Sequence, residues 1–144
     1  MEFVKVTAHA EILALLKQFQ GCFPHLKEKI GSLEEYAKKL SAHAEVVVAL
    51  SEEGTLGLVV YYANDLAGRV GYISLIGVLP EYRRSGYGKL LLDAAASQMQ
   101  AAGMRTIKLE VDNDNAAAFG FYRSYGFNVH SAAGKNSTYL SYTI

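Results

Sequence analysis

The sequence predicts a single-domain α/β protein in which helices flank a mixed, mostly antiparallel sheet that contains one parallel strand pair. Two observations predict this fold class. First, 144 residues, 51% of them hydrophobic, suffice for one packed core and are too few for two ordinary domains. Second, β-rich runs around a turn precede an alternation of strand, helix and strand, which is typical of a parallel crossover. No linker or repeat interrupts the chain, so residues 1–144 form one expected domain.

The N-terminal region begins with a short predicted strand at residues 3–6. Apolar residues at near-helical spacing then predict a helix over residues 8–19. Gly21 and Pro24 end this helix, because neither residue is favourable in a helix interior. A second helical stretch is expected over residues 26–31.

A capping signature and a hairpin follow. Ser32 is followed three residues later by Glu35, a spacing in which each side chain caps a free backbone N–H at the start of a helix. From residue 45 the hydrophobic pattern becomes that of strands. Residues 45–50 and 56–62 therefore predict two antiparallel strands around a turn at 51–54.

The second half of the sequence alternates strands and helices. In chain order we expect a strand (71–78), a helix (89–102), a strand (106–111), a helix (115–125) and two short strands (127–131 and 138–143). Gly103 and Gly126 follow the two helices, as helix-ending glycines commonly do. The predicted order is one strand, two helices, three strands, a helix, a strand, a helix and two strands.

The charge and cysteine content argue against several partners and compartments. Basic and acidic residues both number 14, so no overall positive field attracts nucleic acid or an anionic membrane. The single cysteine, Cys22, excludes an internal disulfide and favours a reducing compartment. The four histidines lack metal-ligand spacing. With no leader-like start and no apolar run of about 18 residues, we expect a cytoplasmic protein that binds no metal, membrane or nucleic acid.

The most informative segment is a glycine-containing loop between a predicted strand and the helix that follows it. Gly86 and Gly88 lack side chains, so a ligand can approach the backbone and successive N–H groups can point into one concavity. The helix start adds unpaired N–H groups and the positive end of its dipole. Arg83, Arg84 and Lys89 add cations at the rim. The loop suits a pyrophosphate; the alternative is an ordinary turn with two glycines and solvated arginines.

Two common nucleotide motifs are absent from this loop, and a third motif is present. Residue 91 is a leucine, whereas the dinucleotide-binding motif Gly-x-Gly-x-x-Gly requires a third glycine there. The P-loop motif Gly-x-x-x-x-Gly-Lys-Ser/Thr does not occur either. The run instead resembles the acetyl-CoA motif Gln/Arg-x-x-Gly-x-Gly/Ala of the GNAT superfamily of N-acetyltransferases. The residues that carry it are Val78, Pro80, Tyr82, Arg83, Gly86 and Gly88. One strand downstream, a second run is similar to the family's Asn-x-x-Ala-x-x-x-Tyr-x-x-x-Gly-Phe, at Asn115, Ala118, Tyr122, Gly126 and Phe127.

The resemblance implies an acetyl-CoA site on the loop and on the strand before it. In this family the strand at 71–78 splays from the strand at 106–111, and pantetheine pairs with the exposed edge like an added strand. The strand residues implied to bind pantetheine are Ile76, Gly77 and Val78, and an N–H near Val78 suits the thioester oxygen. Those implied at the pyrophosphate are Arg83, Arg84, Ser85, Gly86, Tyr87, Gly88 and Lys89. Asn115 is expected to hold the cofactor arm.

Glu110 and Tyr122 are the candidate catalytic residues. Tyr122 follows Asn115 by two helical turns, and the resemblance makes it the general acid toward the leaving thiolate. Without the motif, the simplest interpretation of Tyr122 is an aromatic residue of the hydrophobic core. Glu110 precedes Asn115 by five residues, a spacing similar to that of bacterial acetyltransferases that act on ribosomal-protein N-termini, where a glutamate deprotonates the amine. Glu110 could instead be no more than part of a polar strand face, by strand alternation. Other family members place a carboxylate on the strand that matches residues 71–78, but residues 71–76 hold none, so the base is Glu110, a water chain or no group at all.

The resemblance implies that the protein transfers an acetyl group from acetyl-CoA to a primary amine of a small molecule or peptide, by direct attack through a tetrahedral intermediate. The alternative is a CoA-binding sensor or interaction module without turnover. The acceptor pocket is expected from residues 20–40 and 128–138, which carry no signature, although His25 is a candidate substrate contact. The identity of the amine and the oligomeric state, a homodimer included, stay open.

Overall fold

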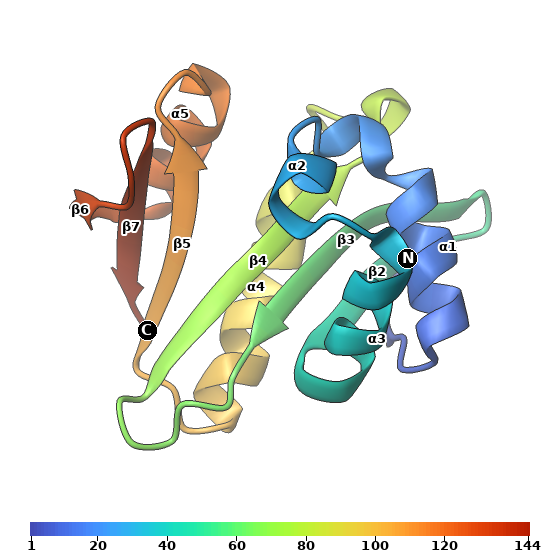
Figure 1. The fold of residues 1–144 in the computed structure, drawn as a ribbon, viewed down its shortest axis with the longest axis horizontal. Helices are drawn as coiled ribbons and strands as arrows, with labels where there is room; N and C mark the ends of the chain where they lie inside the picture. The colour runs from blue at the N-terminus through green and yellow to red at the C-terminus, as the bar shows by residue number, and fades with distance from the viewer.

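The computed structural model describes residues 1–144 and contains one seven-stranded sheet in the order β1-β2-β3-β4-β5-β7-β6 (Figure 1). The strands are β1 (Glu2–Lys5), β2 (Glu45–Ser51), β3 (Gly54–Tyr62), β4 (Val70–Val78), β5 (Thr106–Asp112), β6 (Asn128–Ala132) and β7 (Ser137–Thr143). Every neighbouring pair is antiparallel except β4 and β5. The predicted mixed sheet with one parallel pair is confirmed.

Helices cover both faces of the sheet (Figure 1). They are α1 (His9–Gln18), α2 (Leu26–Ile30), α3 (Leu33–His43), α4 (Tyr87–Ala101) and α5 (Ala116–Tyr125), with short 3-10 turns η1 (Gln20–Cys22) and η2 (Pro80–Tyr82). One buried cluster joins α1 and α3 to one side of β2 and β3, and another joins α4 to the opposite side of these strands and to β5. None of the helices is long and apolar enough to cross a membrane.

Local sequence signals fix the helix boundaries. Half of the predicted capping pair of α3 is present: the Glu35 N–H donates to the Ser32 Oγ at 3.3 Å, whereas the Glu35 carboxylate pairs with Lys38. Gly31 has a φ of 74° and separates α2 from α3, so this region holds three helices where the predicted order had two. The helix α4 begins at Tyr87, two residues before its predicted start, directly after Gly86 at φ 84°.

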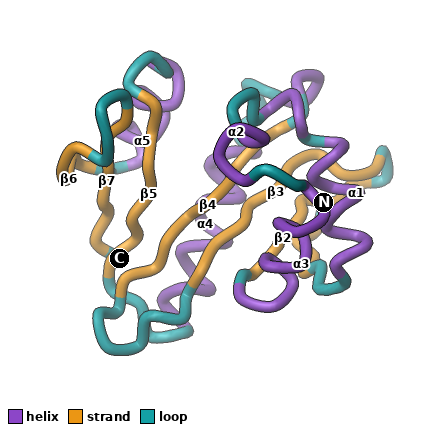
Figure 2. The backbone as a smooth tube through the Cα atoms, viewed as in Figure 1, coloured by secondary structure: helices purple, strands orange, loops and turns teal.

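The parallel pairing of β4 with β5 covers only a short stretch of the two strands. It runs from the pair Val70 and Thr106 to the pair Tyr72 and Lys108. Beyond that point the two strands diverge, while β4 stays paired with β3 as far as Val78 (Figure 2). The splay that the resemblance implied is therefore present, and one backbone edge of β4 faces an opening in the sheet.

A β-bulge lies where the strands begin to diverge. The consecutive residues Val60 and Tyr61 of β3 pair with Leu75 and Ile73 of β4, which leaves Ser74 as an extra, unpaired residue. A bulge bends its strand and increases the local twist. The bulge at Ser74 thus gives a physical reason why β4 turns away from β5 at this position.

Candidate functional site

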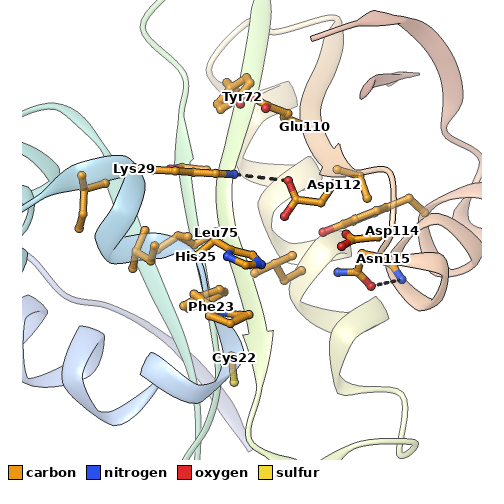
Figure 3. A pocket seen from close by; sticks show the side chains of 18 of the residues that line it. Cys22, Phe23, His25, Lys29, Tyr72, Leu75, Glu110, Asp112, Asp114 and Asn115 are labelled. Atoms are coloured by element: carbon orange, nitrogen blue, oxygen red, sulfur yellow. Dashed lines mark hydrogen bonds and ion pairs between the residues drawn. The ribbon is translucent and has the colours of Figure 1, made fainter. Parts of the chain in front are cut away.

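A cavity of about 530 Å³ lies between the diverging parts of β4 and β5. Its walls also include α2 with the segment before it and the start of α5 (Figure 3). Tyr72 and Glu110 lie together in Figure 3, and Lys29 reaches across toward Asp112. The predicted site residues that line this cavity are Ile76, Glu110, Asn115 and Tyr122.

The loop between β4 and α4 presents a row of free backbone N–H groups. None of the N–H groups of residues 84–89 donates to a backbone carbonyl, and no side chain caps the start of α4. The first intrahelical bond at this end runs from the Leu90 N–H to the Gly86 carbonyl at 3.2 Å. Arg84 and Gly86 have φ values of 65° and 84°, a left-handed backbone that turns neighbouring N–H groups toward a common side. The loop can therefore receive an anion.

The three cations of the loop differ in their surroundings. The Arg83 Nε donates to the Val78 carbonyl at 2.9 Å, so the chain itself holds this guanidinium. Lys89 pairs with Asp93 at 2.9 Å in a solvent-exposed contact, which costs little to rearrange. Arg84 is exposed and makes no ion pair or side-chain hydrogen bond. It is the loop cation most available to a phosphate.

The loop contacts α5 closely. A Cβ atom at Gly88 would lie 3.3 Å from the Phe121 ring, which explains why a glycine suits this position. Phe121 in turn contacts Tyr122 edge to face, with ring centroids 5.2 Å apart. Phe121 thus packs between the loop and Tyr122, which lines the cavity.

The exposed edge of β4 supplies further backbone donors. The Leu79 N–H donates toward β3, to the Leu56 carbonyl at 3.0 Å. Because N–H directions alternate along a strand, the Val78 N–H points to the open side, as does that of Ile76. A Cβ at Gly77 would lie 3.0 Å from the Phe23 ring, so glycine allows the segment before α2 to pack against the strand. These backbone groups are those expected to meet pantetheine.

Tyr122 is buried yet faces the cavity. Only 9% of the residue is exposed, and the rings of Phe121 and Phe127 hold it edge to face. Its hydroxyl makes no hydrogen bond within the chain, and no polar side-chain atom of the protein is both fully buried and unpartnered. The hydroxyl therefore retains access to the cavity. Burial raises the pKa of Tyr122 well above its ordinary value of 10.0, so the phenol stays protonated at neutral pH.

Asn115 is the N-cap of α5 and also lines the cavity. Its Oδ1 accepts from the Ala118 N–H at 3.1 Å (Figure 3). The cap fixes the side chain at the start of the helix and leaves the amide nitrogen without a partner in the chain. This nitrogen can donate to a group in the cavity.

Glu110 lies on the polar face of β5, as the alternation of the strand predicts, with Leu109 and Val111 buried on the other face. The Ser137 hydroxyl donates to the Glu110 Oε2 at 2.7 Å. Ser137 is 8% exposed and, tyrosines aside, is the only buried residue with a polar side chain. The charge of Glu110, after burial itself, helps to raise the pKa of Tyr72 to about 12, which reflects how close the two side chains lie. Sequence reasoning missed Ser137, because the strand register alone brings it to Glu110.

The other titratable residues form no metal site. No group of three or more histidine, cysteine, aspartate or glutamate side chains is arranged to bind a metal ion. His25 lines the cavity but pairs with Glu28 at 3.5 Å.

The fold and this site have two defining features: a sheet that opens at one parallel pair, and a loop of free backbone N–H groups at the end of the splayed strand. The sequence model of the Acetyltransferase (GNAT) family matches residues 12–127. The chain therefore belongs to the GNAT acetyltransferase family.

Individual relatives agree with this assignment. The chain is 43% identical over 53 residues to the [Ribosomal protein bS18]-alanine N-acetyltransferase of Escherichia coli (strain K12), a match covering 37% of this chain and 36% of the relative. The matched segment therefore covers only about a third of the length of that relative.

Two solved structures share the whole fold. The ribosomal-protein-S18-alanine N-acetyltransferase from Escherichia coli superposes with a TM-score of 0.75, 19% identity and coverage of 99% of this chain and 94% of that one. The PaiA N-acetyltransferase from Thermoplasma acidophilum, in complex with coenzyme A, gives a TM-score of 0.74, 17% identity and full coverage of both chains.

Proposed function

We propose that this protein transfers an acetyl group from acetyl-CoA to a primary amine of a small molecule or peptide. The observation that carries the proposal is the run of free N–H groups at residues 84–89, together with a cavity lined by Tyr122 and Glu110. Membership of the GNAT family supports it. So does the structural neighbour that was solved with coenzyme A.

The residues present fit acetyl-CoA. The free N–H groups of residues 84–89, with Arg84, would bind the diphosphate, because both the dipole and the unpaired donors of a helix start favour an anion. The backbone groups of Ile76 and Val78 on the open edge of β4 would bind the amide-bearing pantetheine arm. The Asn115 amide would hold the arm from the α5 side. When bound, acetyl-CoA supplies an acyl group activated as a thioester.

Three groups of the chain would then carry the transfer. Glu110 accepts a proton from the acceptor ammonium, which frees the nitrogen lone pair to form the new C–N bond. The Val78 N–H donates to the thioester oxygen, on which negative charge grows. The C–S bond would then break with its electron pair on sulfur, and the second proton of the attacking nitrogen would pass to the thiolate, which gives the amide and the free thiol of CoA. The raised pKa of Tyr122 lies well above that of an ordinary thiol, about 8.5. The departing thiolate is therefore too weak a base to take the Tyr122 proton, and Tyr122 stabilises the sulfur chiefly as a hydrogen-bond donor.

The proposal is tested by combining two measurements on the purified chain. Calorimetry with acetyl-CoA measures binding, and a thiol-release assay over a panel of primary amines measures turnover. We expect both a binding signal and amine-dependent thiol release. Binding without release for any amine would favour the sensor alternative, and no binding would contradict both.

The raised pKa of Tyr122 has a consequence for the pH dependence of the rate. A donor that must be protonated loses activity as the pH rises through its pKa, which for Tyr122 lies above 10.0. We therefore expect kcat to show no decline between about pH 7 and pH 9.5. A kcat–pH profile at saturating substrates measures this, and a falling limb centred near pH 8 would contradict the role of Tyr122.

Ser137→Ala should lower kcat about tenfold, because a hydrogen bond to a carboxylate that fixes its orientation is worth about 1.5 kcal/mol. The expected change in KM for acetyl-CoA is less than about twofold. Ser137 is a positioning residue, since it acts through Glu110.

Ser141→Ala is the matched control, because Ser141 lies on the same strand and makes no side-chain hydrogen bond. Steady-state kinetics measure kcat for both variants, and we expect a loss in Ser137→Ala only. Equal rates for the two variants would show that the Ser137 contact does not serve catalysis, and Ser137→Thr should restore most of the rate.

A further inference from the structure

The cavity is acidic although the whole chain is neutral. Three carboxylates line it, those of Glu110, Asp112 and Asp114, against one lysine, Lys29. His25 is the only other basic side chain in the lining. The chain has 14 basic and 14 acidic residues, so this imbalance is local. A local excess of negative charge favours a cationic ligand.

An ammonium of the chain already occupies part of this surface. The Lys29 Nζ, from α2, lies 3.7 Å from the Asp112 Oδ1 at the end of β5, on the opposite side of the opening (Figure 3). The two side chains are 56% and 35% exposed. Exposed ion pairs contribute at most about 1 kcal/mol. A ligand ammonium can therefore replace Lys29 at Asp112 at small cost.

Tyr122 is a second observation that points to a ligand in this cavity. The Tyr122 residue is only 9% exposed, lines the same cavity and has no hydrogen-bond partner in the chain. Its hydroxyl is not fully buried and so faces the cavity. A molecule bound in the cavity can supply the partner that the chain does not.

The positions of the two carboxylates on β5 suit a short dication. Glu110 and Asp112 are alternate residues on the polar face of β5, so their Cβ atoms are roughly 6.6 Å apart. The two nitrogens of an extended four-carbon diamine are separated by a similar distance. One nitrogen can therefore lie at Glu110 while the other lies at Asp112.

We propose that the acceptor is an aliphatic diamine or polyamine, whose second ammonium displaces Lys29 and binds Asp112. This inference rests on the proposed function, because it takes Glu110 as the group that meets the reacting nitrogen. Asp112 is then the residue that selects a dication over a monocation.

The test compares butane-1,4-diamine with 4-aminobutan-1-ol, which has the same length and replaces one ammonium by a hydroxyl. We expect the KM of the diamine to be about tenfold lower than that of the amino alcohol, since one charge-assisted contact distinguishes them. In Asp112→Asn the two KM values should become equal, through loss of affinity for the diamine alone. Glu52→Gln, in the exposed turn between β2 and β3, is the control for a lost negative charge and should keep the tenfold ratio.

Calorimetric titration of the diamine into the protein saturated with CoA gives a second readout that needs no turnover. We expect binding to the wild type and about tenfold weaker binding to Asp112→Asn. Acetylation of both amines with equal KM, or an unchanged ratio in Asp112→Asn, would overturn this inference and leave the acetyltransferase function standing. Binding of acetyl-CoA without acetylation of any amine would remove both.

Discussion

Tyr122→Phe is expected to lower kcat about 100-fold, the lower end of what the loss of one transition-state hydrogen-bond donor costs, while the affinity for acetyl-CoA stays within about twofold. The substitution removes one hydroxyl that has no partner in the chain, so it leaves no group of the protein unsatisfied. The phenylalanine ring can keep the edge-to-face contacts with Phe121 and Phe127. The fold should therefore be unchanged.

Tyr142→Phe is the matched control for this experiment. Tyr142 packs against Tyr125 and Phe127, outside the large cavity, and its hydroxyl makes no hydrogen bond in the chain. Single-turnover kinetics with saturating acetyl-CoA should show the loss for Tyr122→Phe and none for Tyr142→Phe. A wild-type rate in Tyr122→Phe would remove Tyr122 from the chemistry.

Gly86→Val is expected to weaken acetyl-CoA binding by at least about 100-fold, which corresponds to losing two charge-assisted hydrogen bonds of about 1.5 kcal/mol each. Gly86 has a φ of 84°, where a β-branched residue is strained. No atom of the protein lies within 4 Å of a Cβ at this position, so the side chain would occupy space at the loop surface that a ligand needs. Calorimetry with acetyl-CoA measures the loss.

A control must separate the effect of backbone strain from the exclusion of the ligand. Gly103→Val is such a control, because it introduces the strain away from the loop. Gly103 follows the other end of α4, has a φ of 93° and also has no atom within 4 Å of a Cβ. Gly103→Val should destabilise the protein by a similar amount, about 1 to 2 kcal/mol, while acetyl-CoA binds normally. Equal loss of affinity in both variants would mean that Gly86→Val acts only through stability.

Much of the site could be predicted because its parts are contiguous in the sequence. The loop of residues 84–89 follows a strand and opens a helix, so its glycines and its free N–H groups follow from local rules. Asn115 and Tyr122 lie on one helix at a spacing of two turns. The polar face of β5 that carries Glu110 follows from strand alternation.

The parts that were not predicted depend on register and on contacts between distant segments. The bulge at Ser74 arises from the pairing of β4 with β3, and the contact of Ser137 with Glu110 from the pairing of β5 with β7. The Arg83 guanidinium turns toward the Val78 carbonyl, a position that the motif alone does not specify. Likewise, the ion pair of Lys29 and Asp112 joins a short helix to a strand that lies far along the chain.

The proposed function requires that the backbone N–H groups of residues 84–89 bind the cofactor's diphosphate. Amide nitrogen and proton chemical shifts measured during a titration with CoA report on these groups, since a hydrogen bond to phosphate moves the resonance of its donor. We expect the largest changes at residues 84–89 and at Val78. If CoA binds while these resonances stay in place and others move, the diphosphate lies elsewhere and the proposed cofactor site is wrong.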